Sequence, residues 1–585
     1  MVSQSIVRAV SRVRSPKMTE TKSCQNCKRD FQIEPQDFAF YKKISVPPPT
    51  FCPQCRLQRR LTFLVGIRLY RRACDLCKKL SVSMYPPEAE CVAYCASCWW
   101  SDKWSPLDYG KEYDFSRPFF QQLKEQWRSV PLLGLSIDPT NVGQSPYNNH
   151  CGPLKNSYLM FYSSETEECA YGTYVINAKS ILDSSYVIQS EDCYDVMHSY
   201  KNNRCVGTRS QVTESFECYF LRDSRNCQNC FASANLRNAK YQIFNKQYSK
   251  EGYFKEIAQW DLGSYKSYKD IERRAHEHWK TLPPKPQYDE MAHDCVGINN
   301  VFESKNARDC FEAVHLEDCR WTSMIGQGPV KDCYDISNWG NNLSLCYESA
   351  EVGENASALK FCNESGINIK DIEYSKLSTG GSHHFGCISV RKTEYCILNK
   401  QYTKEEYAAL IPKIKAHMSE MPYYDAVGRK YTYGEFFPIE LSPYPYNATF
   451  AHSFFPLTKE DVLNQGYKWE DEDKKENTAT IAAADLPDHI KDTPDSILNE
   501  TVGCGECRRG FKIVPMELEF LRTRNFPLPR QCPFCRINEK LNIWVKNMRM
   551  LLRTCSKCQA VFETRYAEDE TPYILCKSCY QKEIV

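Results

Sequence analysis

The sequence has no long apolar stretch among its 585 residues, and its formal net charge is only +2. No run is long enough to cross a bilayer, and no apolar segment of a signal peptide precedes the first cysteines. Neither a membrane protein nor a secreted one is therefore indicated. The 32 cysteines then favour a reducing, cytoplasmic setting, in which thiols bind metal or pack in a core, over a disulfide scaffold.

The low net charge conceals a division along the chain. Residues 1–100 carry 17 Lys and Arg against 7 Asp and Glu, and residues 501–585 carry 15 against 9. The two ends thus hold +10 and +6, which leaves −14 for the middle. Basic ends suit an anionic partner, or they neutralise the acidic middle within one compact particle.

Half of the cysteines form eight Cys-x-x-Cys pairs, four near each end of the chain. The N-terminal pairs are Cys24/Cys27, Cys52/Cys55, Cys74/Cys77 and Cys95/Cys98, and the C-terminal pairs are Cys504/Cys507, Cys532/Cys535, Cys555/Cys558 and Cys576/Cys579. In both regions 24 residues separate the first two pairs and 17 separate the last two. The same double module therefore occurs twice.

This spacing is typical of structural metal sites. Two intervening residues let both thiolates of a pair face one ion, and two pairs complete a tetrahedral sulfur shell. We expect about four Zn²⁺ ions, although iron bound as in rubredoxin uses the same ligands. Four protein thiolates leave no open position for catalysis. Consecutive pairs are the simplest assignment, while a cross-braced pairing, first with third and second with fourth, fits the same spacing.

The residues around the pairs repeat as well. CQNCKRDFQIEPQDFAFYKKISVPPPTFCPQCRLQRRL at 24–61 corresponds to CGECRRGFKIVPMELEFLRTRNFPLPRQCPFCRINEKL at 504–541. Both segments resemble treble-clef-like zinc ribbons. The resemblance implies a metal-dependent hairpin, followed by a helix that starts at the second pair of cysteines, and it implies no particular ligand.

Basic residues beside the pairs are candidates for contacts with phosphates. The residues that we expect to bind nucleic acid are Arg29, Arg56, Arg59, Arg60, Arg71, Arg72, Arg508, Arg509 and Arg536. Phe31, Tyr41, Trp99 and Trp100 are available for base stacking, although packing inside the ribbons explains the two tryptophans better. The arginines also have a simpler explanation as solvated surface charge.

Between the ribbons a short unit recurs, for example CAYGTYVINAKS at 169, ILDSSYVIQSED at 181 and CYDVMHSYKNNR at 193. Each unit of 11 to 13 residues holds one short strand rich in Cys, Tyr, Val or Ile, followed by turn residues. A second, less regular array runs from about 294 to 400. Stacked units of this kind predict parallel β-helices with one unit, or two, in each coil.

The arrays contain cysteines at the same point of successive units, such as Cys169, Cys193 and Cys205. We expect these to pack as small apolar side chains. Cys227 and Cys230 form a further Cys-x-x-Cys pair without an evident partner pair, which leaves redox chemistry or metal binding open.

His383 and His384 are the best candidates for chemistry in the middle of the chain, because they lie beside a Gly-rich stretch and Cys387. A Cys–His pair can provide an activated thiolate. No third residue that would orient such a pair is visible nearby, so an exposed turn is the simpler interpretation of both histidines.

The expected fold is mainly β with short helices, in which two parallel β-helix-like arrays are flanked by double zinc-ribbon modules. We expect a disordered extension over 1–17, a double ribbon over 18–105, a helical connector over 106–155, the first array over 156–249, a second connector over 250–292, the second array over 293–402, a helix and linker over 403–500, and the second double ribbon over 501–585. The basic, acid-free stretch 1–17 also suits a targeting arm.

Both arrays end alike, in FNKQYSKE and LNKQYTKE, where Ser249 and Thr403 are placed to cap a helix. A further helix is expected over 114–131 with Ser116 as its cap, and such helices would cover the open ends of the arrays. With this order of modules the whole chain resembles a family of zinc-ribbon repeat proteins from candidate-phylum bacteria with small genomes. The resemblance implies the architecture and no activity.

Three functions are compatible with these features. Closed metal sites and basic ends favour a non-enzymatic scaffold that binds RNA or a ribonucleoprotein. A protein-interaction platform that uses the solenoid face, with the metal modules as staples, is the first alternative. The second is a β-helix enzyme with its site on the solenoid, although no recognised acid–base pair marks that face.

Overall fold

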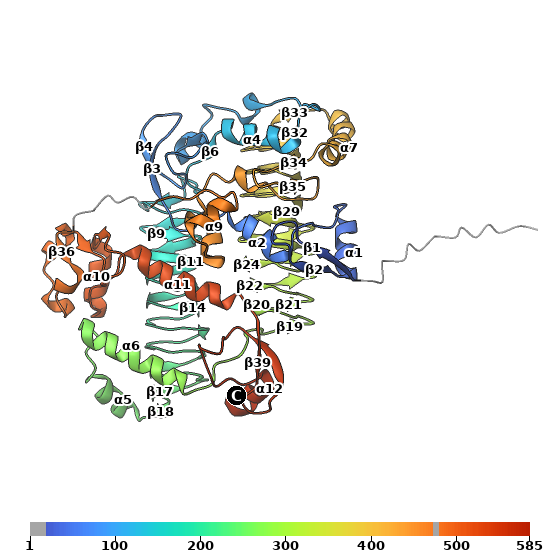
Figure 1. Ribbon diagram of the computed structural model, residues 1–585. Coiled ribbons are helices and arrows are strands. Elements are labelled where there is room, and N and C mark those ends of the chain that lie inside the picture. The colour runs from blue at the N-terminus through green and yellow to red at the C-terminus, as the bar shows by residue number, and fades with distance from the viewer. Residues whose placement is uncertain (1–18, 472–478, 585) are drawn as a thin grey trace, which may run out of the picture.

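The computed structural model describes residues 19–471 and 479–584, so the extension expected over 1–17 lies outside the described residues. Two columns of stacked coils stand side by side, with small modules and helices around them (Figure 1). The prediction of a mainly β protein with two solenoid arrays and cysteine-rich modules at both ends is confirmed. Within the described residues, no helix is both long and apolar enough to span a membrane.

The first array begins earlier than residue 156, within the stretch expected to form a helical connector. Its strands are β7 (Val142–Gly143), β8 (Leu154–Lys155), β9 (Tyr158–Phe161), β10 (Ser164–Glu167), β11 (Ala170–Leu182), β12 (Ser185–Ile188), β13 (Glu191–Tyr194), β14 (Met197–Tyr200), β15 (Val212–Thr213), β16 (Gln228–Phe231) and β17 (Lys240–Ile243). Parallel pairing joins residues 12 positions apart, as in Ser185 with Met197. One sequence unit therefore forms one complete coil.

Each coil is four-sided, because a left-handed residue recurs at every third position. Asp183, Tyr186, Gln189 and Asp192 have φ between 50° and 58°, and the series resumes at Asp195 one coil later. Left-handed geometry costs an ordinary residue roughly 1–2 kcal/mol. The parallel backbone hydrogen bonds between coils hold each corner in place.

The side chains of every third residue fill the inside of the coil. In one coil these are Cys193, Val196, Ser199 and Asn202, all at most 2% exposed. The thiol of Cys193 donates a hydrogen bond to the carbonyl of Glu191, at 3.2 Å. Twelve residues enclose little space, so small side chains that can bond to the backbone are favoured there.

The cysteines of the first array are packing residues, as expected. Cys169, Cys205, Cys227 and Cys230 are buried at 0–2% exposure, and each donates its thiol hydrogen to a backbone carbonyl. Burial raises the pKa of the Cys169 thiol to about 12. Cys227 and Cys230 belong to the same interior, and no second cysteine pair faces them in the described chain.

The second array contains β19 (Ala292–His293), β20 (Asn299–Phe302), β21 (Ser304–Lys305), β22 (Phe311–Val314), β23 (Leu316–Glu317), β24 (Ser323–Ile325), β25 (Val330–Lys331), β26 (Tyr334–Ser337), β27 (Gly340–Ser344), β28 (Tyr347–Ala350), β29 (Gly353–Lys360), β30 (Ile367–Glu373), β31 (Thr379–Phe385) and β32 (Arg391–Ile397). Phe311 pairs with Ser323, 12 residues on, but Leu316 pairs with Val330, 14 residues on. Extra residues at the coil corners explain the uneven spacing of the sequence units.

Both arrays end in the same way, with an antiparallel hairpin and a capped helix. In the first array β18 (Lys246–Gln247) turns back on β17, and α5 (Lys250–Ile257) follows with Ser249 as its N-cap. In the second, β33 (Lys400–Gln401) pairs with β32, and Thr403 caps α7 (Lys404–Glu420). The predicted caps are thus confirmed, and each hairpin closes the last coil of its array.

The two arrays run antiparallel to each other (Figure 1). Side-chain contacts between them, in order along the first array, are His150–Glu351, Tyr174–Asn338, His198–Glu312 and Gln211–Asn300. The residue numbers rise in the first array while they fall in the second. The arrays are consequently side by side rather than end to end, a question that the sequence left open.

The segments between the arrays and modules are helical or tightly packed. Helix α4 (Phe119–Ser129) follows Pro118 and is not capped by Ser116, whose hydroxyl donates to Asp114 instead. Helix α6 (Tyr265–Lys280) has Ser264 as its N-cap. The stretch 421–471, expected to be a partly ordered linker, places many aromatic side chains in the core, including Tyr431, Phe436, Phe437, Tyr446 and Phe450.

Candidate metal centres and their docking on the solenoids

Four ribbons carry the Cys-x-x-Cys pairs. The first contains β1 (Glu20–Ser23), β2 (Asp30–Ile33), α1 (Pro35–Lys43) and α2 (Pro53–Leu61); the second β3 (Tyr70–Ala73), β4 (Leu80–Ser83), β5 (Ala93–Tyr94) and α3 (Ala96–Trp99); the third β37 (Val502–Gly503), β38 (Gly510–Phe511), α10 (Pro515–Arg524) and α11 (Pro533–Asn547); the fourth β39 (Leu551–Thr554), β40 (Val561–Thr564) and α12 (Lys577–Ile584). Helices α2 and α11 start directly after Cys52 and Cys532, as the ribbon resemblance implies.

Consecutive pairs of cysteines converge in every ribbon. The four groups are Cys24, Cys27, Cys52 and Cys55; Cys74, Cys77, Cys95 and Cys98; Cys504, Cys507, Cys532 and Cys535; and Cys555, Cys558, Cys576 and Cys579. Within each group all Sγ atoms lie within 4.8 Å of one another. The cross-braced pairing does not occur.

The sulfur geometry fits a tetrahedral metal ion. Thiolates about 2.3 Å from zinc at tetrahedral angles would be about 3.8 Å apart. The Cys27 and Cys52 sulfurs lie 3.8 Å apart, and those of Cys558 and Cys576 3.7 Å apart. In all four ribbons a backbone N–H also donates to the first thiol of the group, at 3.2–3.3 Å. Such bonds stabilise a thiolate, so these residues suit a structural metal ion.

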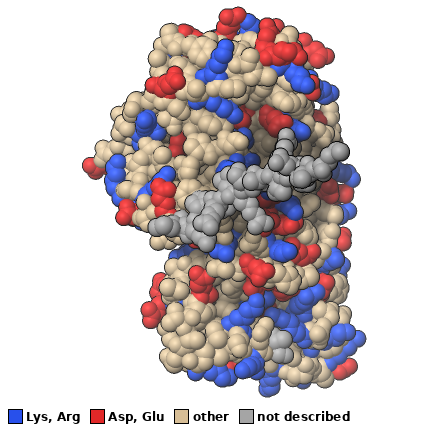
Figure 2. Space-filling model, turned by 90° about the vertical axis from the view of Figure 1, so that its right-hand side faces the viewer, with Lys and Arg blue, Asp and Glu red and all other residues tan. Residues whose placement is uncertain are grey.

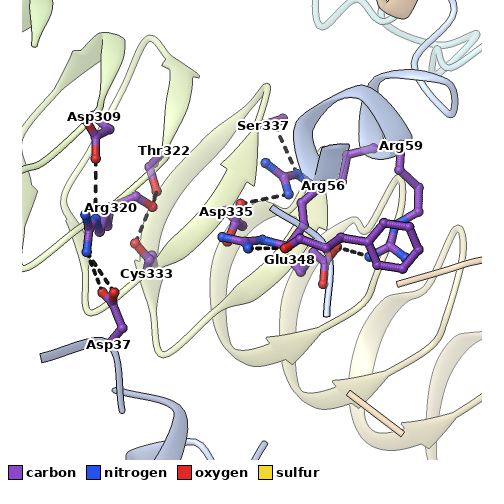
Figure 3. A network of polar contacts seen from close by, with 12 residues as sticks. Asp37, Arg56, Arg59, Asp309, Arg320, Thr322, Cys333, Asp335, Ser337 and Glu348 are labelled. Atoms are coloured by element: carbon purple, nitrogen blue, oxygen red, sulfur yellow. Dashed lines mark hydrogen bonds and ion pairs between the residues drawn. The ribbon is translucent and has the colours of Figure 1, made fainter. Parts of the chain in front are cut away.

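The arginines that follow the first ribbon's last cysteine are buried against the second array (Figure 3). Arg56 and Arg60 form ion pairs with the two oxygens of Asp335, at 2.8 and 3.0 Å. Arg59 pairs with Glu348 and also, at 3.1 Å, with Glu435. The three guanidinium side chains are at most 2% exposed.

The third ribbon docks in the same way on the first array. Arg536 pairs with Asp183 and, at 2.9 Å, with Glu517 of its own ribbon. Lys540, one turn along α11, pairs with Asp195 at 2.7 Å. The N-terminal ribbon therefore binds the second array, while the C-terminal one binds the first.

This docking changes the interpretation of four of the expected RNA contacts. Arg56, Arg59, Arg60 and Arg536 do not face solvent, because the helix after the second cysteine pair turns its cations toward acidic corners of a coil. Leaving one of these charges without its partner inside the protein would be costly, so the ion pairs hold the ribbons in place. The basic ends and acidic middle thus neutralise each other at the two docking sites.

Burial also shifts the acidic partners. It raises the pKa of Glu348 to about 7 and that of Asp183 to about 6, in each case against the opposing effect of the arginine. Burial likewise disfavours the charge of Asp195, but Arg209 and Lys540 outweigh it and lower the pKa of that carboxyl.

A short motif that the sequence analysis did not single out marks both docking sites. Cys-Tyr-Asp occurs at 193–195 and again at 333–335. Tyr334 stacks on Phe40 of the first ribbon, with ring centroids 3.9 Å apart, and Tyr194 lies 5.2 Å from Phe526 of the third. The aspartate that follows each tyrosine makes the ion pairs already described. Recurrence of this tripeptide once in each array is the signal that could have located the docking sites.

The other candidate arginines lie nearer the surface. Arg29, Arg71, Arg508 and Arg509 are exposed, whereas Arg72 is partly buried and donates to the carbonyl of Cys91. We define the tip of a ribbon as its first Cys-x-x-Cys turn and the next two residues: 24–29, 74–79, 504–509 and 555–560. Three tips end in two exposed cations, Lys28–Arg29, Lys78–Lys79 and Arg508–Arg509. The fourth ends in Gln559–Ala560.

The aromatic candidates for base stacking are mostly internal. Phe31, Tyr41 and Trp99 are 9%, 2% and 1% exposed, as the packing interpretation of Trp99 predicts. Trp100 is 42% exposed and packs edge-on against Trp99.

The two histidines do not lie in an exposed turn, as was expected. His384 belongs to β31 and is buried inside the second array, where its Nε2 lies 2.8 Å from the carbonyl of Thr393. Burial lowers its pKa to about 4. The Cys387 thiol donates to backbone carbonyls, and no hydrogen bond joins it to either histidine in the described residues. His383 is partly exposed and stacks on Tyr395.

A small opening of about 70 Å³ lies between the first array, α6 and the third ribbon. Its charged walls are largely the docking residues themselves, including Asp183, Asp195, Arg536 and Lys540. These side chains are engaged with one another, so the opening belongs to the docking site.

Comparison with known proteins adds little to this description. No known family model matches the chain, and no curated protein matches it. Among solved structures, the chain has a similarity to a "putative acetyltransferase" from Desulfovibrio desulfuricans, with 10% identity over 44% of this chain and 68% of that one. The TM-score is 0.10, so this similarity carries no argument about fold or function.

Proposed function

We propose that this protein is a metal-stapled, non-enzymatic scaffold that binds RNA or a ribonucleoprotein through the exposed tips of its ribbons. The observation that carries the proposal is the pair of exposed cations at three of the four tips, in ribbons whose other arginines are engaged with the solenoids. Paired cations outside the protein's own ion-pair networks are the form in which a protein meets phosphates.

The tips have a common local geometry. The first cation of each pair is left-handed, with φ of 61° at Lys28 and Lys78 and 63° at Arg508. The ammonium groups of Lys28 and Lys78 each donate to one carbonyl of their own turn, at 2.7 and 2.6 Å. An ammonium has three donors, so two remain for an anion.

The ribbons lie on different sides of the particle: β1–β2 is at the right of Figure 1, β3–β4 at the upper left and the third ribbon at the left. A large folded partner that meets several tips at once would gain affinity by multivalency. In other parts of the surface, Lys and Arg alternate with Asp and Glu (Figure 2).

We propose Zn²⁺ as the metal, because a closed shell of four thiolates is its usual structural site. Elemental analysis of the purified protein is expected to find about four zinc ions per chain. Two or fewer, or iron in their place, would contradict this assignment.

The RNA proposal is tested by the salt dependence of binding to a structured RNA. The double variant Lys78→Gln/Lys79→Gln is expected to weaken binding about three- to tenfold and to lower the slope of log K against log[salt] by about 1–2. Lys269→Gln/Arg273→Gln on α6 removes the same charge from another exposed site and is the matched control. Absence of binding at low salt, or an equal loss in the control, would refute the proposal.

A further inference from the structure

The cationic tips have no exposed aromatic ring beside them. Phe31 follows the first tip and Phe511 occupies the same place after the third, and both are buried at 8–9% exposure. In the second ribbon the corresponding position is Ser81. Within the described residues of the three tips, the groups offered to a ligand are therefore cations and backbone.

The exposed ring closest in sequence to a metal ligand, Trp100, is held in place by the protein. Its Nε1 donates to the carbonyl of Ile137 at 3.2 Å, and its ring centroid lies 4.7 Å from that of Trp99. It follows the last cysteine of the second ribbon, Cys98, rather than the tip at 74–79. Trp100 thus joins the ribbon to the first array and does not form part of a cationic tip.

These two observations distinguish between kinds of RNA. Proteins that bind unpaired strands combine cations with exposed rings on which the bases stack. A paired, A-form helix hides its bases and presents phosphates and 2′-hydroxyls, which cations and backbone groups can contact alone. The tips have the second composition and lack the first.

We infer that the ribbons contact the sugar–phosphate backbone of base-paired RNA, without reading its sequence, rather than unpaired bases. This inference rests on the proposed function and names its substrate class. The cations at each tip engage phosphates of one helical segment, and tips on different sides of the particle engage different segments.

The test compares two labelled RNAs of equal length and charge, a stable hairpin and an unstructured oligouridine, with the metal-loaded full chain. The hairpin is expected to bind at least tenfold more tightly at the same salt concentration, and two hairpins of unrelated sequence equally well. Equal or tighter binding of oligouridine would overturn the inference and leave the proposed function standing. Binding of neither RNA would overturn the proposed function, and the inference with it.

A variant separates cation contacts from stacking. Lys78→Gln/Lys79→Gln is expected to weaken hairpin binding, while Trp100→Phe, which keeps a ring packed on Trp99, is expected to leave it unchanged within twofold. A tenfold loss of RNA affinity in Trp100→Phe, with the metal content unchanged, would show that a base stacks there and would overturn the inference.

Discussion

The first and third ribbons are two copies of one module that dock on different arrays with different charge arrangements. In both, an arginine follows the last metal ligand, Arg56 in one and Arg536 in the other, and enters an ion pair with a corner aspartate of a coil. Four residues later the first ribbon has Arg60 and the third has Lys540, again paired with an aspartate. The shared helix therefore sets where the cations lie.

The difference between the docking sites lies in how the carboxylates are shared. Asp335 alone serves Arg56 and Arg60, whereas Asp183 shares Arg536 with Glu517. The second array also supplies Glu348 for Arg59. At the corresponding places the first array has Gly207 and the third ribbon an exposed Glu539. Ribbon and coil thus match each other in charge, position by position.

Loss of a metal ligand is expected to have the largest effect. Cys24→Ser removes a buried ligand of the first ribbon, should release α2 from the second array and is expected to cost more than about 5 kcal/mol, since structural zinc contributes about 10–16 kcal/mol in small domains. Cys558→Ser changes an exposed thiol of the fourth ribbon and should unfold that ribbon alone. Metal content and hydrogen exchange in α2 check both variants. Equal deprotection of α2 in the two would contradict the comparison.

Removal of a corner carboxylate should separate the two docking sites most clearly. Asp335→Asn leaves two buried guanidinium groups without their carboxylate and is expected to cost about 3–5 kcal/mol. Asp183→Asn leaves Arg536 with Glu517, so about 1–3 kcal/mol is expected. Hydrogen exchange in α2 and α11, read separately, measures each loss, because a chain of this size need not unfold in two states. A larger effect at Asp183 would refute the assigned sharing of charge.

The pH response of the first docking site should depend on Glu348. Its pKa rises from 4.5 in the unfolded chain to about 7 in the folded one, so the folded state binds the proton more tightly. The associated stability is full below about pH 4.5 and is lost as the pH rises through 7, by up to about 3 kcal/mol. Glu348→Gln cannot ionise and should remove this loss. Protection of α2 measured between pH 5 and 8 in both proteins tests it; parallel profiles would contradict the prediction.

The smallest expected difference concerns the aromatic contacts. Phe40 stacks on Tyr334 at 3.9 Å, and Phe526 lies 5.2 Å from Tyr194. Phe40→Leu is expected to lose about 1 kcal/mol more than Phe526→Leu, because the closer stack contributes beyond the area it buries. The same exchange measurement serves, and an equal cost would mean that burial alone accounts for both contacts.

The sequence was most informative where covalent spacing decides the structure. The intervals between Cys27 and Cys52 and between Cys507 and Cys532 identify the ribbons, because metal geometry allows few spacings. The repeat of 11 to 13 residues predicts the coils for a similar reason, since backbone pairing imposes a constant step. Neither feature depends on how distant parts of the chain meet.

The interpretation of the arginines failed for the opposite reason. Arg56, Arg59 and Arg536 look like surface cations in sequence, because nothing near them in the chain is an evident partner. Their carboxylates lie hundreds of residues away, Asp335 for Arg56 and Asp183 for Arg536. His384 was misread similarly, since only the stacking of coils shows that this position of β31 points inward.

The sequence by itself determined the modules of this protein: four cysteine groups with metal-site spacing, two arrays of short coils and the capped helices that close them. Local physics suffices there, because tetrahedral ligation and backbone pairing act between residues close in the chain. Only the tertiary structure decided that the arrays lie antiparallel and that each terminal ribbon docks on the array of the other half. Those arrangements depend on burial and charge pairing between surfaces, which residue spacing does not encode.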